Sequence, residues 1–246
     1  MLIIANWKAY VEDVPKAAAL ASAAKRLART SGVELVLAPP APFLGLLARA
    51  SGPVAFAAQD VSATTGGAKT GEVTAASVRA AGARYAIVGH SERRAAGDTD
   101  TVVAEKLRHA LAQKLVPILC VGETARDGDG RYLARLRESL ASALGGLTAK
   151  EAASVIIAYE PVWAIGKTAA DAIPPADLAE TALYLRKVLA EFLPGRSAAR
   201  AAILYGGSVE PENARALAGE TGVAGFLVGH ASVEPETFAA LVRAVA

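Results

Sequence analysis

Cysteine is almost absent from this sequence, which has one, Cys120, among 246 residues. One cysteine cannot form a disulfide within the chain, and without further thiolates it cannot assemble a cysteine-based metal site. We therefore interpret Cys120 as a small buried residue. Long apolar runs are lacking too, because no stretch approaches the roughly 20 residues that span a bilayer. The start, MLIIANWK, has no basic segment before its apolar residues, so we expect a cytoplasmic protein without a membrane partner.

An excess of charge of one sign is also missing. Lysine and arginine number 26 against 24 aspartates and glutamates, a net charge of +2 with no block of like charge. This balance predicts no extended basic surface for binding nucleic acid, so no nucleic-acid partner is expected. Any positively charged site must be local. Hydrophobic residues make up 53% of the chain and charged residues 20%, which suits a large core and argues against disorder.

Short apolar runs rich in β-branched residues recur eight times, at residues 2–5, 33–38, 54–58, 85–88, 116–121, 155–159, 201–205 and 225–228. They largely lack polar alternation, which is typical of strands buried on both faces of a parallel sheet. Amphipathic helices are expected between them, at residues 14–29, 102–113, 132–144, 178–192 and 235–245, with shorter ones near 43–49, 75–81 and 211–217. This α/β rhythm predicts a single-domain (β/α)8 barrel over residues 1–246, and an open doubly wound sheet is the weaker alternative.

Polar residues gather where these runs end, which in a barrel is the carboxyl face that carries active sites. The apolar run before Glu160 stops at Pro161, so the carboxylate is displayed at a strand end. The loop that follows contains the apolar residues Trp163 and Ile165, which should avoid water, so we expect this loop to close over a site. A lysine, a histidine and a glutamate from three distant strands predict a reactive site there. The residues at these ends are Asn6, Lys8, His90, Glu92, Cys120, Glu160, Gly206, Gly207, Ser208, Gly229 and His230.

Seven short strings along essentially the whole chain are similar to those of triosephosphate isomerase. They are NWK at residue 6, GAKTGE at 67, GHSERR at 89, CVGET at 120, YEPVWAIG at 159, YGGSV at 205 and GFLVG at 225. The most specific is YEPVWAIG, which resembles the catalytic base and mobile lid of that family. The resemblance implies interconversion of dihydroxyacetone phosphate and D-glyceraldehyde 3-phosphate through an enediolate, with a small phosphorylated sugar as substrate and neither cofactor nor metal.

The resemblance also assigns the catalytic residues. Moving a hydrogen between adjacent carbons needs a base for a weakly acidic C–H, an electrophile for the oxygen that gains charge, and shielding from water. Glu160 matches the base and His90 the electrophile, which is established to be a neutral imidazole in triosephosphate isomerase. Lys8 would favour the substrate dianion and the enediolate, and Asn6 would donate to a substrate oxygen. Glu92, through a hydrogen bond or an ion pair, and Cys120 are expected to support the site.

Phosphate recognition by this resemblance relies on backbone donors that approach closely, which suits glycine at strand ends. The expected cradle is Gly206, Gly207, Ser208 and Gly229, with the amide of Gly166 added when the lid closes. His230 replaces the second glycine of the family's phosphate turn. We expect its backbone to suit a non-glycine residue, its amide to contact phosphate and its imidazole to point outward.

The string around Gly67 resembles the protruding loop of a homodimer. Thr70 would insert beside Asn6 and Lys8 of the partner, and Glu72 would meet an arginine such as Arg93 across the interface. The lid departs from the family pattern after Gly166, where Thr-Gly is missing before Lys167. Two alternatives stay open, the first of them because of this change and His230. One is an isomerase of a larger ketose phosphate, a tetrulose phosphate. The other is a non-catalytic sugar-phosphate-binding barrel, which would not require a base.

Overall fold

Eight parallel strands close into a barrel in chain order, with β1 pairing to both β2 and β8. The computed structural model describes residues 1–50, 52–166, 172–219 and 221–246. Within them the strands are β1 Leu2–Asn6, β2 Glu34–Ala38, β3 Ala55–Ala58, β4 Tyr85–Val88, β5 Val116–Val121, β6 Ile156–Tyr159, β7 Ile203–Tyr205 and β8 Gly225–Val228. The predicted (β/α)8 barrel is confirmed, and the open sheet is excluded.

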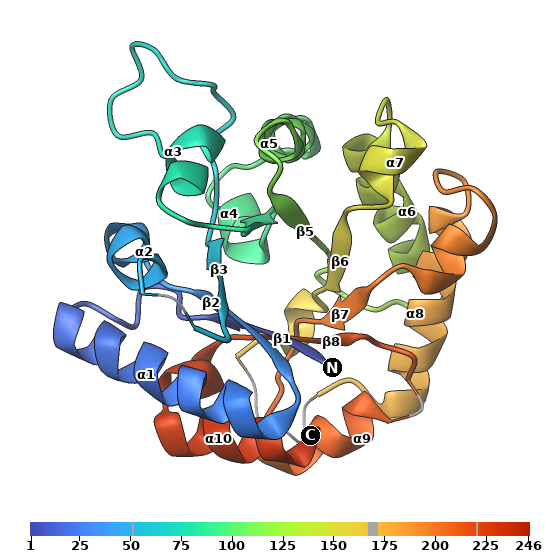
Figure 1. Ribbon diagram of the computed structural model, residues 1–246. Helices are drawn as coiled ribbons and strands as arrows, with labels where there is room; N and C mark the ends of the chain where they lie inside the picture. Colours follow the sequence, from blue (N-terminus) through green and yellow to red (C-terminus); the bar gives the residue numbers. More distant parts are fainter. Residues whose placement is uncertain (51, 167–171, 220) are drawn as a thin grey trace.

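Helices surround the barrel on the outside (Figure 1). The described α-helices are α1 Val14–Ser31, α2 Ala41–Ala48, α3 Ala75–Ala80, α4 Ser91–Ala95, α5 Asp100–Ala112, α6 Arg131–Leu144, α7 Ala149–Ala152, α8 Pro175–Leu189, α9 Pro211–Ala218 and α10 Pro235–Ala244. Short 3-10 turns are η1 Val162–Ala164, η3 Gly195–Arg200 and η4 His230–Val233. The helices α4 and α7 were not predicted, because four or five residues are too short to show a helical period.

Side chains inside the barrel form a layer of their own. Alternate residues on each strand point inward, and they make a buried cluster that includes Ile4, Val36, Ile118, Ala158 and Leu204. The remaining strand residues pack outward against the helices in a second, larger cluster. Because the alternation has a period of two, the inner face of β6 runs from Ile156 through Ala158 to the next inward position, Glu160.

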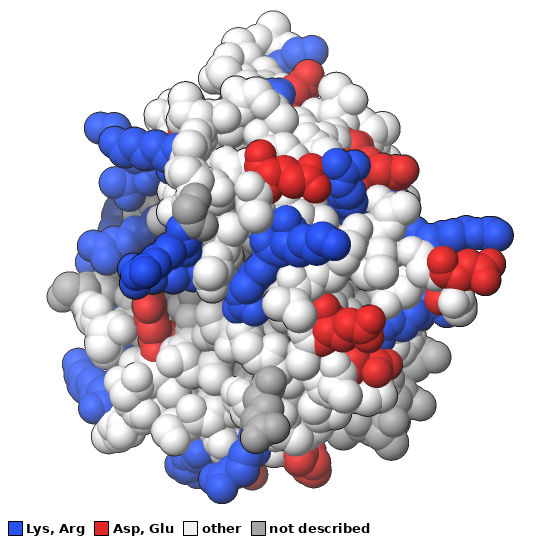
Figure 2. Space-filling view, turned by 90° about the vertical axis from the view of Figure 1, so that its right-hand side faces the viewer, with Lys and Arg blue, Asp and Glu red and all other residues white. Residues whose placement is uncertain are grey.

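One loop leaves this compact arrangement. Between β3 and α3 the chain projects far from the body (Figure 1), and residues 65–73 are exposed. Val73 in this loop is 39% exposed, although it is apolar. On the face shown in Figure 2, side chains of both charge signs lie on a mostly uncharged surface. No helix in the described part of the chain is both long and apolar enough to cross a membrane.

Candidate active site

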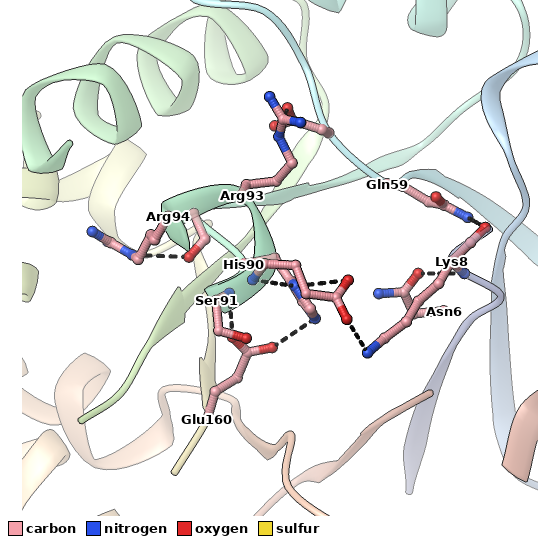
Figure 3. A network of polar contacts seen from close by, with 11 residues as sticks. Asn6, Lys8, Gln59, His90, Ser91, Arg93, Arg94 and Glu160 are labelled. Carbon is pink, nitrogen blue, oxygen red and sulfur yellow. Dashed lines mark hydrogen bonds and ion pairs between the residues drawn. The ribbon is translucent and has the colours of Figure 1, made fainter. Parts of the chain in front are cut away.

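The ends of β1, β4 and β6 bring the predicted catalytic side chains together. Asn6, Lys8, His90 and Glu160 line one cavity of about 380 Å³ at the carboxyl mouth of the barrel. Figure 3 shows His90 and Lys8 converging from opposite sides, with Glu160 beside His90. Residues that are far apart in the sequence therefore share one site, as expected from the strand ends.

Glu160 is only 2% exposed, and within the described part of the chain no lysine or arginine forms an ion pair with it. Its Oε2 accepts a hydrogen bond from the backbone N–H of Ser91 at 2.9 Å. Its Oε1 lies 3.1 Å from Nε2 of His90, but this contact is not aligned as a hydrogen bond. That oxygen is buried beside the imidazole, in a residue that lines the cavity.

The imidazole of His90 caps α4, and this fixes its tautomer. Its Nδ1 accepts a hydrogen bond from the backbone N–H of Glu92 at 3.2 Å. A nitrogen that accepts cannot carry the proton, so the ring is neutral and its proton is on Nε2, facing the cavity beside Glu160.

The ammonium group of Lys8 lies between the Glu92 carboxylate and the glycine turn at Gly229. Its Nζ is 2.6 Å from Oε1 of Glu92, an exposed carboxylate. A Cβ built on Gly229 would lie 3.3 Å from Cε of Lys8, so the lysine side chain passes directly over that turn. The predicted support by Glu92 is an ion pair to Lys8, together with the backbone hydrogen bond to His90.

Glycines lie next to Glu160 because side chains at these positions would collide with it. A Cβ on Gly122 would lie 1.7 Å from the carbonyl oxygen of Glu160. A Cβ on Gly206 would lie 3.0 Å from Cγ of Glu160 and 3.5 Å from the carbonyl oxygen of Tyr159. Gly206, expected at the phosphate, thus packs against the base. Cys120 is fully buried as expected, and burial, together with the nearby Glu160 carboxylate, raises the pKa of its thiol.

The remaining wall of the cavity is formed by the residues predicted to hold phosphate. Gly166, Gly206, Gly207, Ser208, Gly229 and His230 all line it. The hydroxyl of Ser208 donates to the carbonyl of Ala164 at 2.8 Å, which ties this wall to the segment after Glu160. The altered sequence that begins at Lys167 lies outside the described residues, so the structure does not test it.

His230 begins η4 and does not adopt a left-handed φ. A non-glycine residue is therefore compatible with the turn, as expected. Its imidazole packs edge-on against the half-exposed ring of Tyr10, with ring centroids 5.3 Å apart. Burial raises the pKa of the Glu210 carboxyl, whereas the nearby His230 lowers this pKa. The three side chains form the rim of the cavity.

A second cavity, of about 550 Å³, adjoins the first and shares Asn6, Lys8 and His90 with it. It is also lined by Glu72 and Arg93, two residues assigned to the dimer contact. Arg93 pairs with Asp60 of the same chain at 3.0 Å. Thr70 is exposed at the projecting loop and touches neither cavity.

Sequence reasoning gave no role to two residues that the structure ties to the site. Gln59 donates to the carbonyl of Lys8. Glu123 is buried, and its Oε1 accepts from the hydroxyl of Tyr159 at 2.7 Å and from the indole N–H of Trp163 at 2.9 Å. The buried carboxylate thus anchors the start of the segment after Glu160. The sequence did offer a sign of Glu123, because this polar residue follows the end of a strand, as the predicted site residues do. Among the described residues no group of three or more His, Cys, Asp or Glu side chains is placed to share a metal ion.

A closed (β/α)8 barrel with a carboxylate, an imidazole and an ammonium group at its carboxyl mouth defines the class: a barrel enzyme with its active site in the βα loops. A family model described as Triosephosphate isomerase matches residues 1–245. The chain is 43% identical to the triosephosphate isomerase of Symbiobacterium thermophilum, over 100% of this chain and 96% of that relative. It is 38% identical to that of Carboxydothermus hydrogenoformans, over 98% and 97% of the two chains.

The similarity extends to a third relative, the triosephosphate isomerase of Leifsonia xyli, at 40% identity over 98% of this chain and 96% of the relative. The chain therefore belongs to the triosephosphate isomerase family, and it is an isomerase. That family binds a small phosphorylated sugar. The predicted family and enzyme class are confirmed, and nothing in these comparisons favours the tetrulose phosphate or non-catalytic alternatives.

Proposed function

We propose that this chain interconverts dihydroxyacetone phosphate and D-glyceraldehyde 3-phosphate through an enediolate. The observation that carries the proposal is the proximity of Glu160 and His90: Oε1 of the buried Glu160 carboxylate lies 3.1 Å from Nε2 of His90, whose Nδ1 accepts a hydrogen bond, and both residues line one cavity. A base and an electrophile side by side suit proton transfer at a carbon next to a carbonyl.

In this proposal Glu160 takes the proton from one substrate carbon and returns it to the neighbouring carbon. His90 donates from Nε2 to the substrate oxygens and carries protons between them. Lys8 stabilises the charge that develops on the enediolate, and Asn6 donates to the same oxygen region.

The phosphate group would bind at the opposite wall of the cavity. We propose that the backbone N–H groups of Ser208, Gly229 and His230, with Gly207 beside them, receive it, joined by the amide of Gly166. Lys8 supports this assignment, since its side chain crosses Gly229 and can attract the dianion. Gly206 contributes by leaving room for Glu160, and Cys120 supports the base from inside the barrel.

We further propose a homodimer in which the projecting loop of each chain fills the 550 Å³ cavity of the other. The support is that the loop is exposed and that the cavity is lined by Asn6 and Lys8. Thr70 would reach those residues of the partner. Glu72 would then compete with Asp60 for Arg93, which is already engaged within its own chain. A cytoplasmic location and the absence of a nucleic-acid partner stay predictions.

The test is to assay purified protein on D-glyceraldehyde 3-phosphate and, in parallel, on a tetrulose phosphate. We expect rapid turnover of the triose phosphate and at least about 100-fold lower kcat/KM for the larger sugar, because one added carbon separates phosphate from the reacting carbons by more than the fixed cavity allows. Equal or better turnover of the tetrulose phosphate would establish the alternative isomerase. Binding without turnover of either sugar would leave the non-catalytic barrel.

A further inference from the structure

The backbone of Lys8 adopts a conformation that lysine normally avoids. Its φ is 45°, and within the described ranges the other non-glycine residue with positive φ is Lys114. A side chain in the left-handed region costs free energy, so the conformation persists only where neighbouring groups enforce it. Lys114 lies in a turn after α5, remote from the cavities, whereas Lys8 carries the cation of the proposed active site.

Two side chains clamp the Lys8 backbone from its two sides. Its N–H donates to Oδ1 of Asn6 at 3.1 Å. Its carbonyl accepts from Nε2 of Gln59 at 2.9 Å. The same Nε2 donates to the carbonyl of Ala38, the last residue of β2, also at 2.9 Å. One side-chain amide at the end of β3 thus uses both of its hydrogens to tie the residue after β1 to β2, as Figure 3 shows for Gln59 and Lys8.

Gln59 does not share the cavity that holds Glu160 and the glycine turn. It lines the neighbouring 550 Å³ cavity, while the smaller cavity is lined by Lys8 and not by Gln59. Its amide is therefore directed at the Lys8 backbone and not at a bound sugar phosphate. The hydrogen bond from Gln59 to the Lys8 carbonyl links it to the place where the Lys8 ammonium is held.

We propose that Gln59 is a positioning residue for Lys8. It holds the Lys8 peptide in the left-handed conformation and so directs Nζ across Gly229, where the cation meets both the phosphate and the reacting oxygens. The proposal rests on the proposed function of Lys8 in substrate binding. Without the Gln59 donor, the Lys8 carbonyl loses its partner, the peptide relaxes toward a common conformation, and the ammonium group moves away from the turn.

The test is a double-mutant cycle of four proteins: wild type, Lys8→Ala, Gln59→Met and the double variant. Methionine keeps the length of glutamine and has no N–H donor. Two quantities are measured for each protein, kcat/KM for D-glyceraldehyde 3-phosphate and the dissociation constant of glycerol 3-phosphate. Gln113→Met is the matched control, since Gln113 is the only other glutamine and is exposed at the end of α5.

We expect Gln59→Met to lower kcat/KM about 10- to 100-fold and to weaken glycerol 3-phosphate binding, because a displacement of about 1 Å at a charged group costs this much. In the Lys8→Ala background, Gln59→Met is expected to change each of the two quantities by less than about twofold, because the ammonium group that Gln59 positions is gone. Gln113→Met is expected to change neither quantity.

A merely structural role for Gln59 would give the same loss in both backgrounds, and that result would overturn the proposal. So would wild-type values for folded Gln59→Met. If Gln59→Met does not fold, as judged by thermal unfolding, Gln59→Glu goes through the same cycle, because it keeps the size of the side chain and also lacks the donor. If the wild type binds glycerol 3-phosphate but has no turnover, the proposed function fails, while the binding cycle still decides the role of Gln59.

Discussion

Replacing Gly206 by alanine tests whether the position of Glu160 limits the reaction. Gly206 has no left-handed φ, so alanine adds no backbone strain there. Its Cβ would lie 3.0 Å from Cγ of Glu160, whereas carbon atoms in contact prefer about 3.5–4.0 Å. The Glu160 side chain must therefore retreat by about 0.5–1 Å.

A displacement of about 1 Å at a reacting group can cost about 100-fold in rate. We therefore expect Gly206→Ala to lower kcat about 10- to 100-fold, equivalent to about 1.4–2.7 kcal/mol of lost transition-state stabilisation. Binding of glycerol 3-phosphate is expected to stay within about threefold of wild type, because the amides of the phosphate turn are not displaced. The assay is steady-state turnover of D-glyceraldehyde 3-phosphate, with inhibitor binding measured by calorimetry.

Gly128→Ala is the control, because its added Cβ meets open space and its φ is not left-handed. It is expected to leave kcat unchanged. A folded Gly206→Ala protein with wild-type kcat would refute the reasoning that the base must be held within a fraction of an ångström. If kcat is normal while inhibitor binding is lost, Gly206 acts at the phosphate, and its contact with Glu160 is incidental.

Three further predictions follow from the site and the projecting loop. Lys8→Ala should weaken both inhibitor binding and turnover, and a change confined to the melting temperature would make Lys8 structural. Deleting residues 67–71 should give monomers with at least about tenfold lower kcat, so a fully active monomer in sedimentation would contradict the dimer. Burial raises the pKa of Glu123 above its ordinary value of 4.5, so the folded chain binds this proton more tightly than the unfolded chain. The free energy of unfolding therefore falls as pH rises from 4.5 through the folded-state pKa of Glu123. Glu123→Gln keeps an oxygen for Tyr159 and Trp163 and should remove this slope in urea unfolding; parallel pH profiles would show that the carboxyl is not its source.

The barrel could be predicted from the sequence because each buried strand is a short apolar run with a turn after it, and this signal is repeated eight times. The helix α4 could not, since its five residues are fixed by the imidazole of His90 at its N-terminus, a tertiary arrangement of GHSERR. The meeting of Lys8, His90 and Glu160 in one cavity was predictable from their places at strand ends.

Other features of the site depend on through-space geometry that has no local signature. Gln59 was visible as a polar residue after the third apolar run. Nothing in the sequence NWK indicates a left-handed lysine, however, and so nothing indicated that Gln59, 51 residues away, clamps it. Gly206 follows a strand end as a phosphate glycine would, yet it packs against Glu160, because β6 and β7 are neighbours in the barrel. Glu123 was visible as a polar strand end, but its two donors were identified only by the fold.

The central claim is that Glu160 is the base that removes a carbon-bound proton. Steady-state turnover of D-glyceraldehyde 3-phosphate by Glu160→Asp tests it most directly, because the substitution keeps the carboxylate and retracts it by one methylene. The account predicts that kcat falls about 100-fold or more while glycerol 3-phosphate binds nearly as in the wild type. A folded Glu160→Asp protein with a near-normal kcat would contradict the account.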